Sequence, residues 1–178
     1  YSDHLERLSE EQFRRQMRQA AHLLTNGQGE DAIPLLKRCH GLHPDDINVL
    51  INLGGAYILS GRHRLAVPLL ERASELDPDN PVVWSNLAAA YLGQIILSTR
   101  AKQDKALAAY RRVIELDASY PHAHYNMGLI HIDRRDWDAA YIAFTLAIES
   151  NPYDEDAHVL RQRVEQLRAR PDASPLAN

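Results

Sequence analysis

The sequence predicts an all-α fold, an α-solenoid of four helix-turn-helix repeats followed by a C-terminal capping helix. The chain is similar to itself at spacings of 34, 40 and 34 residues, counted between Ala32, Ala66, Ala106 and Ala140. Within each repeat, apolar residues recur at the i, i+3, i+4, i+7 spacing of one helix face. Glycine or proline interrupts these patterns at regular places. A period of this length is typical of stacked helix pairs that bury a shared core.

The repeats are predicted at residues 13–46, 47–80, 81–120 and 121–154. In the second repeat, the first helix presents an apolar face that begins at Leu50, and the second helix begins its face near Ala66. Gly61 separates the two helices, and Pro78 follows the second one. The acidic segments HPDD, DPDN and YDED should cap the helices that follow them. Pro34 and Pro68 are expected in first helical turns, which tolerate proline.

The ends of the chain differ from the repeats. Residues 1–12 form an N-terminal flank that continues the first helix or makes a short turn. Residues 155–170 predict the capping helix, because an apolar stripe alternates there with Arg, Gln and Glu. Residues 171–178 are expected to be a disordered tail. Since the chain begins with Tyr1 and not Met, we expect a processed form or a piece of a longer protein.

These repeats resemble the tetratricopeptide repeat (TPR), which pairs a W-x-x-L-G-x-x-Y helix with a second helix ending near proline. The resemblance covers residues 13–154 and implies a right-handed solenoid. The first repeat departs from it with Gln16 and Gln19 at apolar positions, and the fourth with His124 and His131 at the Trp-like and Tyr-like positions. The second and third repeats carry the matching residues, which are Leu50, Leu53, Gly54, Tyr57, Ala66, Leu70, Ala73, Pro78, Trp84, Leu87, Ala88, Tyr91, Ala106, Tyr110 and Val113.

Composition excludes several classes of function. The net charge of −4, with 25% charged residues, argues against nucleic-acid binding, which needs a basic surface. No apolar run approaches the ~20 residues of a membrane span, and no signal peptide is visible. The single cysteine, Cys39, allows no internal disulfide. The compartment stays open, with the cytoplasm slightly favoured.

In the resembled family, the sixth residue of each repeat faces a concave groove. Here Arg18, Asn52, Asn86 and Asn126 occupy that position. A carboxamide can pair with both polar groups of a peptide unit, so the asparagines predict a ladder that holds the backbone of an extended partner. The competing interpretation is an ordinary solvated face. Further groove candidates are Arg14, Met17, Asn48, Ile51, Gly55, Leu59, Val82, Ser85, Ala89, His122, Tyr125 and Leu129.

The two arginines of the first repeat raise the question of an acidic ligand. Arg14 and Arg18 lie one helical turn apart, where they could take a carboxylate or phosphate, although a solvated basic face explains them as well. TPR domains that hold the acidic tails of chaperones use Lys, Asn, Asn, Lys and Arg as a clamp. This chain has Met17, Ala21, Asn52, Val82 and Asn86 at those positions. Since one of the five matches, the sequence argues against that ligand.

The third repeat carries a six-residue insertion between Tyr91 and Ala106. We expect it to lengthen the first helix of the repeat and the following turn. Ile95, Ile96 and Leu97 cannot all face one core, so they either form an exposed contact patch or pack against the longer helix.

Catalysis and metal binding are not predicted. The histidines show no established ligand spacing, and His124 and His131 fall at core positions. Cys39 falls in a column of small buried residues and should be inert. No nucleophile elbow, phosphate-binding loop or H-E-x-x-H pair is present. Arginines gather in the turns within repeats and aspartates between repeats, where helix capping explains most of them.

The leading hypothesis is a non-enzymatic adaptor or scaffold that holds an extended peptide of a partner protein and uses no cofactor. The alternative is a structural subunit that self-associates through the insertion, the capping helix or an outer face. Concentration-dependent self-association distinguishes the two.

Overall fold

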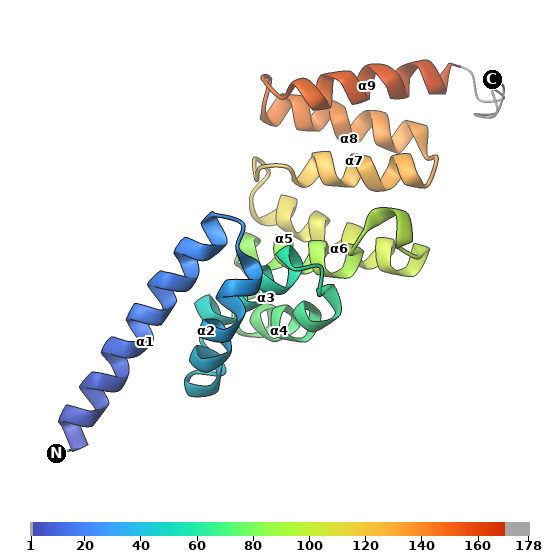
Figure 1. Cartoon of the computed structure of the whole chain (residues 1–178). Coiled ribbons are helices and arrows are strands. Elements are labelled where there is room, and N and C mark those ends of the chain that lie inside the picture. The colour runs from blue at the N-terminus through green and yellow to red at the C-terminus, as the bar shows by residue number, and fades with distance from the viewer. Residues whose placement is uncertain (1, 170–178) are drawn as a thin grey trace. The chain divides into compact units, whose positions relative to one another are not determined.

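The computed structural model describes residues 2–169, and within them every regular element is a helix. The all-α fold class is therefore confirmed. The chain forms two compact units, one ending at Gly93 and the other beginning at Gln94 (Figure 1). The predicted third repeat is thus divided between them. The prediction of a disordered tail at 171–178 lies outside the described residues.

Unit 1 consists of five helices in two hairpins and a further helix (Figure 1). The long α1 and α2 form the first hairpin, α3 and α4 form the second, and α5 packs on both α3 and α4. The predicted flank 1–12 lies within α1, apart from Tyr1, which is not described. The helices span Ser2–Thr25 (α1), Gly29–Leu42 (α2), Ile47–Leu59 (α3), His63–Leu76 (α4) and Pro81–Leu92 (α5).

In the described residues 94–169, unit 2 begins with a short 3₁₀ helix and contains four α-helices. The α7–α8 hairpin is its centre, with α6 packed on α7 and α9 packed on α8. The helix α9 corresponds to the segment expected as a cap. The elements span Ile95–Leu97 (η1), Arg100–Leu116 (α6), Ala123–Asp133 (α7), Trp137–Ser150 (α8) and Glu155–Arg168 (α9).

The cores are built where a large side chain meets a glycine on the neighbouring helix. A Cβ added to Gly54 of α3 would lie 2.7 Å from Cγ of Leu70 of α4. In α7, a Cβ on Gly128 would lie 2.7 Å from Cζ of Phe144 of α8. Leu70 and Phe144 are both fully buried. The missing side chains therefore let the paired helices approach closely.

Local capping fixes where the helices begin. The side chains of Asp46 and Asp154 accept hydrogen bonds from the backbone N–H groups of Val49 and Ala157, each at 3.0 Å. These two predicted caps are confirmed. In the DPDN segment, the cap of α5 is Asn80 and not an aspartate. The predicted break at Gly61 is also confirmed, because α3 ends at Leu59 and α4 begins at His63. Gly61 itself has a φ of +70°, a conformation that favours glycine.

Two expectations about helix bounds are wrong. The insertion does not lengthen the first helix of the third repeat: α5 ends at Leu92, and Gly93 then takes a φ of +60°. The added residues instead form η1 and the start of α6. Pro34 and Pro68 lie inside α2 and α4, beyond the first turn. Both helices continue past a proline that donates no backbone hydrogen bond.

Arginines at helix ends and in turns link neighbouring helices through ion pairs, which capping alone did not predict. Arg62 binds Glu30 of α2 at 2.9 Å, and Arg168 binds Asp138 of α8 at 2.7 Å. Arg134 donates to Asp104 at 2.6 Å and to the side chain of Gln103 at 2.8 Å. Gln103 is a buried polar residue of the core, and it also donates to Asp133. This network holds the first turn of α6 against the α7–α8 turn.

Candidate functional site

A groove of about 290 Å³ opens in unit 1. The helix α3 supplies most of its wall, with residues at the i, i+1, i+4, i+7, i+8 spacing of one helix face. The helices α1 and α5 contribute one residue each. The lining residues are Leu24, Ile51, Asn52, Gly55, Ile58, Leu59 and Asn86.

Two of the predicted ladder asparagines meet in this groove. Asn52 of α3 and Asn86 of α5 both line it and are half-buried. Neither carboxamide has a hydrogen-bond partner within residues 9–169. Each can therefore offer a donor and an acceptor to a ligand. A backbone peptide unit carries the complementary pair of groups.

The rest of the groove lining is aliphatic. Leu24, Ile51 and Ile58 are half-buried, and Leu59 remains 56% exposed. No lining residue carries a formal charge. The groove therefore favours a neutral segment with apolar side chains, since burying an unpaired charge is costly.

The predicted basic and polar neighbours do not line this groove. Arg14, Arg18 and Asn48 are exposed and do not belong to the groove lining. Arg14 pairs with Glu10 on its own helix at 3.7 Å. An acidic ligand would therefore meet no basic side chain among the groove residues.

The third ladder residue, Asn126, lies in unit 2 and has a partner. Its side chain interacts with the hydroxyl of Tyr110, a buried residue of α6. Burial raises the pKa of Tyr110 to about 12, and the interaction with Asn126 partly offsets this rise. Asn52 and Asn86 therefore share one groove, and Asn126 does not line it.

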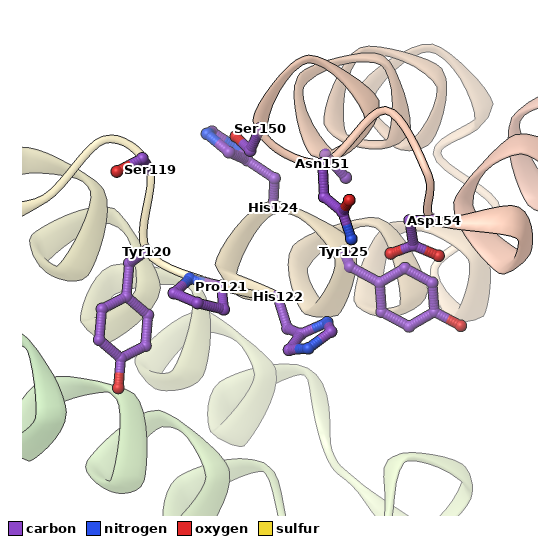
Figure 2. Close-up of a pocket in the computed structure, with 10 residues that line it drawn as sticks. Ser119, Tyr120, Pro121, His122, His124, Tyr125, Ser150, Asn151 and Asp154 are labelled. Carbon is purple, nitrogen blue, oxygen red and sulfur yellow. The ribbon is translucent and has the colours of Figure 1, made fainter.

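A second pocket, of about 180 Å³, lies in unit 2 where the α6–α7 loop meets the end of α8 (Figure 2). Tyr125 lies beside Asp154 of the α8–α9 turn there, and Tyr120 points away from it. His122 takes the left-handed conformation, with φ of 63°, and α7 has no side-chain cap. The lining residues are Ser119, Tyr120, Pro121, His122, His124, Tyr125, Ala147, Ser150, Asn151 and Asp154.

Several polar side chains of this second pocket are already engaged within the fold. Asp154 caps α9, and Asn151 accepts from the backbone N–H of Tyr153 at 3.3 Å. Ser119 and Ser150 donate to Asp117 and to the backbone of Leu146. The second pocket is therefore the weaker candidate site.

His131 of α7 is a half-buried titratable group outside both pockets. Its Nδ1 has no hydrogen-bond partner within the described residues, and the nearest carboxylate, Asp136, lies 3.8 Å away. Burial lowers the pKa of His131, while Asp136 opposes the shift and Arg134 and Arg111 add to it. Burial also lowers the pKa of His124.

We expect unit 2 to lose stability as the pH falls below about 6.5, the pKa of a histidine in an unfolded chain. Because the folded-state pKa of His131 and His124 is lowered, the unfolded chain takes up protons first, and acid then favours unfolding. Urea unfolding followed by the fluorescence of Trp137 at neutral and mildly acidic pH measures this loss, with Trp84 of unit 1 replaced by phenylalanine. The His131→Tyr variant should lose less stability at mildly acidic pH than the wild type. An equal loss in both proteins would show that His131 is not a source of the pH dependence.

The insertion exposes its apolar residues. Ile96 and Leu97 of η1 are 81% and 71% exposed, while Ile95 is half-buried. The alternative in which the longer helix covers all three is therefore wrong for Ile96 and Leu97.

No metal or reactive-thiol chemistry is evident in the described part of the chain. It holds no group of three or more His, Cys, Asp or Glu side chains arranged to bind a metal. Cys39 is fully buried, and its Sγ lies 3.6 Å from Oε1 of Gln16. Burial raises the pKa of the Cys39 thiol.

Within residues 2–169, no helix combines the length and the apolar character that a membrane crossing requires.

Sequence reasoning missed two groove residues, Leu24 and Ile58. They stand 34 residues apart, at the same position of successive repeats, so the period itself could have found them. It also missed the second pocket, whose loop conformation at His122 has no sequence signal.

Stacked helix hairpins of this period define the class of helical-repeat proteins. The repeat itself is identified by two family models: "Tetratricopeptide repeat" matches residues 47–80, and "TPR repeat" matches residues 100–133. These two segments of the chain are therefore tetratricopeptide repeats. The second match covers α6 and α7, so it crosses the boundary predicted at residue 120. No curated protein gives a significant sequence match.

Solved structures share the fold. A crystal structure of MamA has a TM-score of 0.73 and 23% identity over 84% of each chain. A tetratricopeptide-repeat protein from Parabacteroides merdae has a TM-score of 0.70 and 20% identity, over 89% of this chain and 61% of that one. The first TPR of Spaghetti (RPAP3), bound to the HSP90 peptide SRMEEVD, has a TM-score of 0.60 and 23% identity, over 69% and 95%.

The tetratricopeptide-repeat fold is a protein–protein interaction module, and its members are generally non-enzymatic scaffolds. The HSP90 peptide is a ligand of the RPAP3 domain, and a structural similarity at 23% sequence identity does not assign that ligand to this chain.

Proposed function

We propose that this chain is an adaptor that holds an extended peptide segment of a partner protein in the unit 1 groove. The observation that carries the proposal is the pair of carboxamides, Asn52 and Asn86, which face one groove without partners among the described residues. Extended peptide backbone offers unpaired N–H and C=O groups, and each carboxamide can meet both. The aliphatic lining adds apolar contact area.

The proposal is tested with peptides selected from a random display library on the whole chain. For a selected peptide, the Asn52→Ala, Asn86→Ala double variant should bind about 10- to 100-fold more weakly, because lost hydrogen bonds are worth about 1 kcal/mol each. Fluorescence anisotropy measures the affinity, and circular dichroism checks that the variant is folded.

The Asn26→Ala variant is the control, because Asn26 is exposed in the α1–α2 turn outside the groove. It should keep the wild-type affinity. If the double variant and the wild type bind every selected peptide with equal affinity, the groove is not the peptide-binding site.

A structural, self-associating role is the second candidate, favoured by the exposure of Ile96 and Leu97. If η1 is an assembly surface, light scattering should show a mass that rises with concentration. The Ile96→Ser, Leu97→Ser variant should then remain monomeric with unchanged helicity. If the wild-type protein has the mass of a monomer at every concentration, this role is ruled out.

A further inference from the structure

The two adjacent glycines of α3 serve different purposes. Gly54 is required by packing, because any side chain there would overlap Leu70. A Cβ added to Gly55 would meet nothing within 4 Å. The backbone at Gly55 has no positive φ, so its conformation does not require glycine either. Glycine inside a helix costs about 1 kcal/mol relative to alanine, and no contact in the described residues explains that cost.

The space above Gly55 belongs to the groove. Gly55 lines it together with Leu24, Ile51, Ile58 and Leu59, and Asn52 lies one turn earlier on the same face of α3. The volume of about 290 Å³ is at the lower limit of the ~300–1,000 Å³ typical of sites for drug-sized ligands. A side chain with its flanking backbone suits this space better than a cofactor.

The lining also determines which side chain fits. A charged side chain would lose its hydration and find no partner charge among the lining residues. An aliphatic side chain would bury apolar surface against four leucine and isoleucine side chains. The neighbouring carboxamides would meet the polar backbone on either side of it.

We infer that the groove selects a neutral, extended peptide carrying an aliphatic side chain that lies over Gly55, and that Gly55 determines this specificity by keeping the space open. This inference rests on the proposed function and adds the chemistry of the ligand. It names leucine, isoleucine, valine or methionine as the anchor and excludes aspartate and glutamate from that position.

The test is a double-mutant cycle between Gly55 and the peptide anchor. The probe is a display-selected peptide that depends on Asn52 and Asn86, with each of its residues replaced in turn by alanine. One aliphatic residue should stand out, its replacement weakening binding on the order of tenfold, which corresponds to the burial of one aliphatic side chain. The Gly55→Leu variant should weaken the parent peptide similarly, yet hardly weaken the peptide that already lacks the anchor.

Gly41→Leu is the matched control. Gly41 is also a helical glycine of unit 1 whose added Cβ would meet nothing, and it is exposed on α2 outside the groove. This variant should bind like the wild type. If asparagine-dependent peptides bind Gly55→Leu as well as wild type, or lose affinity additively, the inference is wrong and the groove proposal stands. If no selected peptide depends on the asparagines, the proposed function fails and the inference fails with it.

Discussion

Replacing Phe144 with alanine is expected to destabilise unit 2 by about 3–5 kcal/mol, the largest effect of any single truncation we foresee. The ring is fully buried in α8 and lies directly over Gly128 of α7. It also meets the ring of Tyr125 edge-on, with 5.7 Å between the ring centroids. Alanine would remove these contacts and leave a cavity that the α7–α8 hairpin can close only in part.

Urea unfolding followed by Trp137 fluorescence measures this loss in unit 2, with Trp84 of unit 1 replaced by phenylalanine in both proteins. The control is Ile142→Ala in the same helix, where the side chain is 58% exposed. Surface truncations usually stay within about 0.5 kcal/mol. Similar losses in the two variants would mean that Phe144 is not the centre of the unit 2 core.

Gly54→Leu and Gly55→Leu are expected to change stability in opposite directions. Gly54→Leu forces a side chain into the space of Leu70, which is fully buried. Overpacking of this kind costs about 1–3 kcal/mol, occasionally more. Gly55→Leu meets no protein atom at its Cβ and should gain up to about 1 kcal/mol from helix propensity.

Urea unfolding followed by Trp84 fluorescence measures both changes in unit 1, with Trp137 replaced by phenylalanine. Gly41→Leu is again the control and should behave like Gly55→Leu. A large destabilisation by Gly55→Leu would show that the fold needs this glycine, and the space above it would then need no ligand to explain it.

Much of the fold follows from local chemistry that repeats along the chain. Asp46 and Asp154 begin their helices because a side-chain acceptor there satisfies an N–H group that the helix cannot. The contact of Gly54 with Leu70 in unit 1 has its counterpart in the contact of Gly128 with Phe144 in unit 2. Both units therefore pack a large side chain against a glycine. Asn52 and Asn86 reach the same groove because they lie 34 residues apart.

Other features could not be read from the period. The insertion has no repeat to align with, and a short apolar run such as Ile95–Leu97 fits a helix or a turn equally well. Asn126 shares the position of Asn52 and Asn86, but Tyr110 brings a hydroxyl where the other repeats have Leu36, Leu70 or Phe144. A buried tyrosine hydroxyl needs a partner, and the side chain of Asn126 interacts with it.

The most direct test of the binding groove is a nuclear magnetic resonance titration of the whole chain with a display-selected peptide, following the side-chain carboxamide signals of asparagine. We expect the signals of Asn52 and Asn86 to shift as the peptide saturates the protein, while those of Asn26 and Asn151 stay in place. Shifts confined to unit 2, with Asn52 and Asn86 unchanged at saturation, would show that the peptide binds elsewhere and that the groove is not the site.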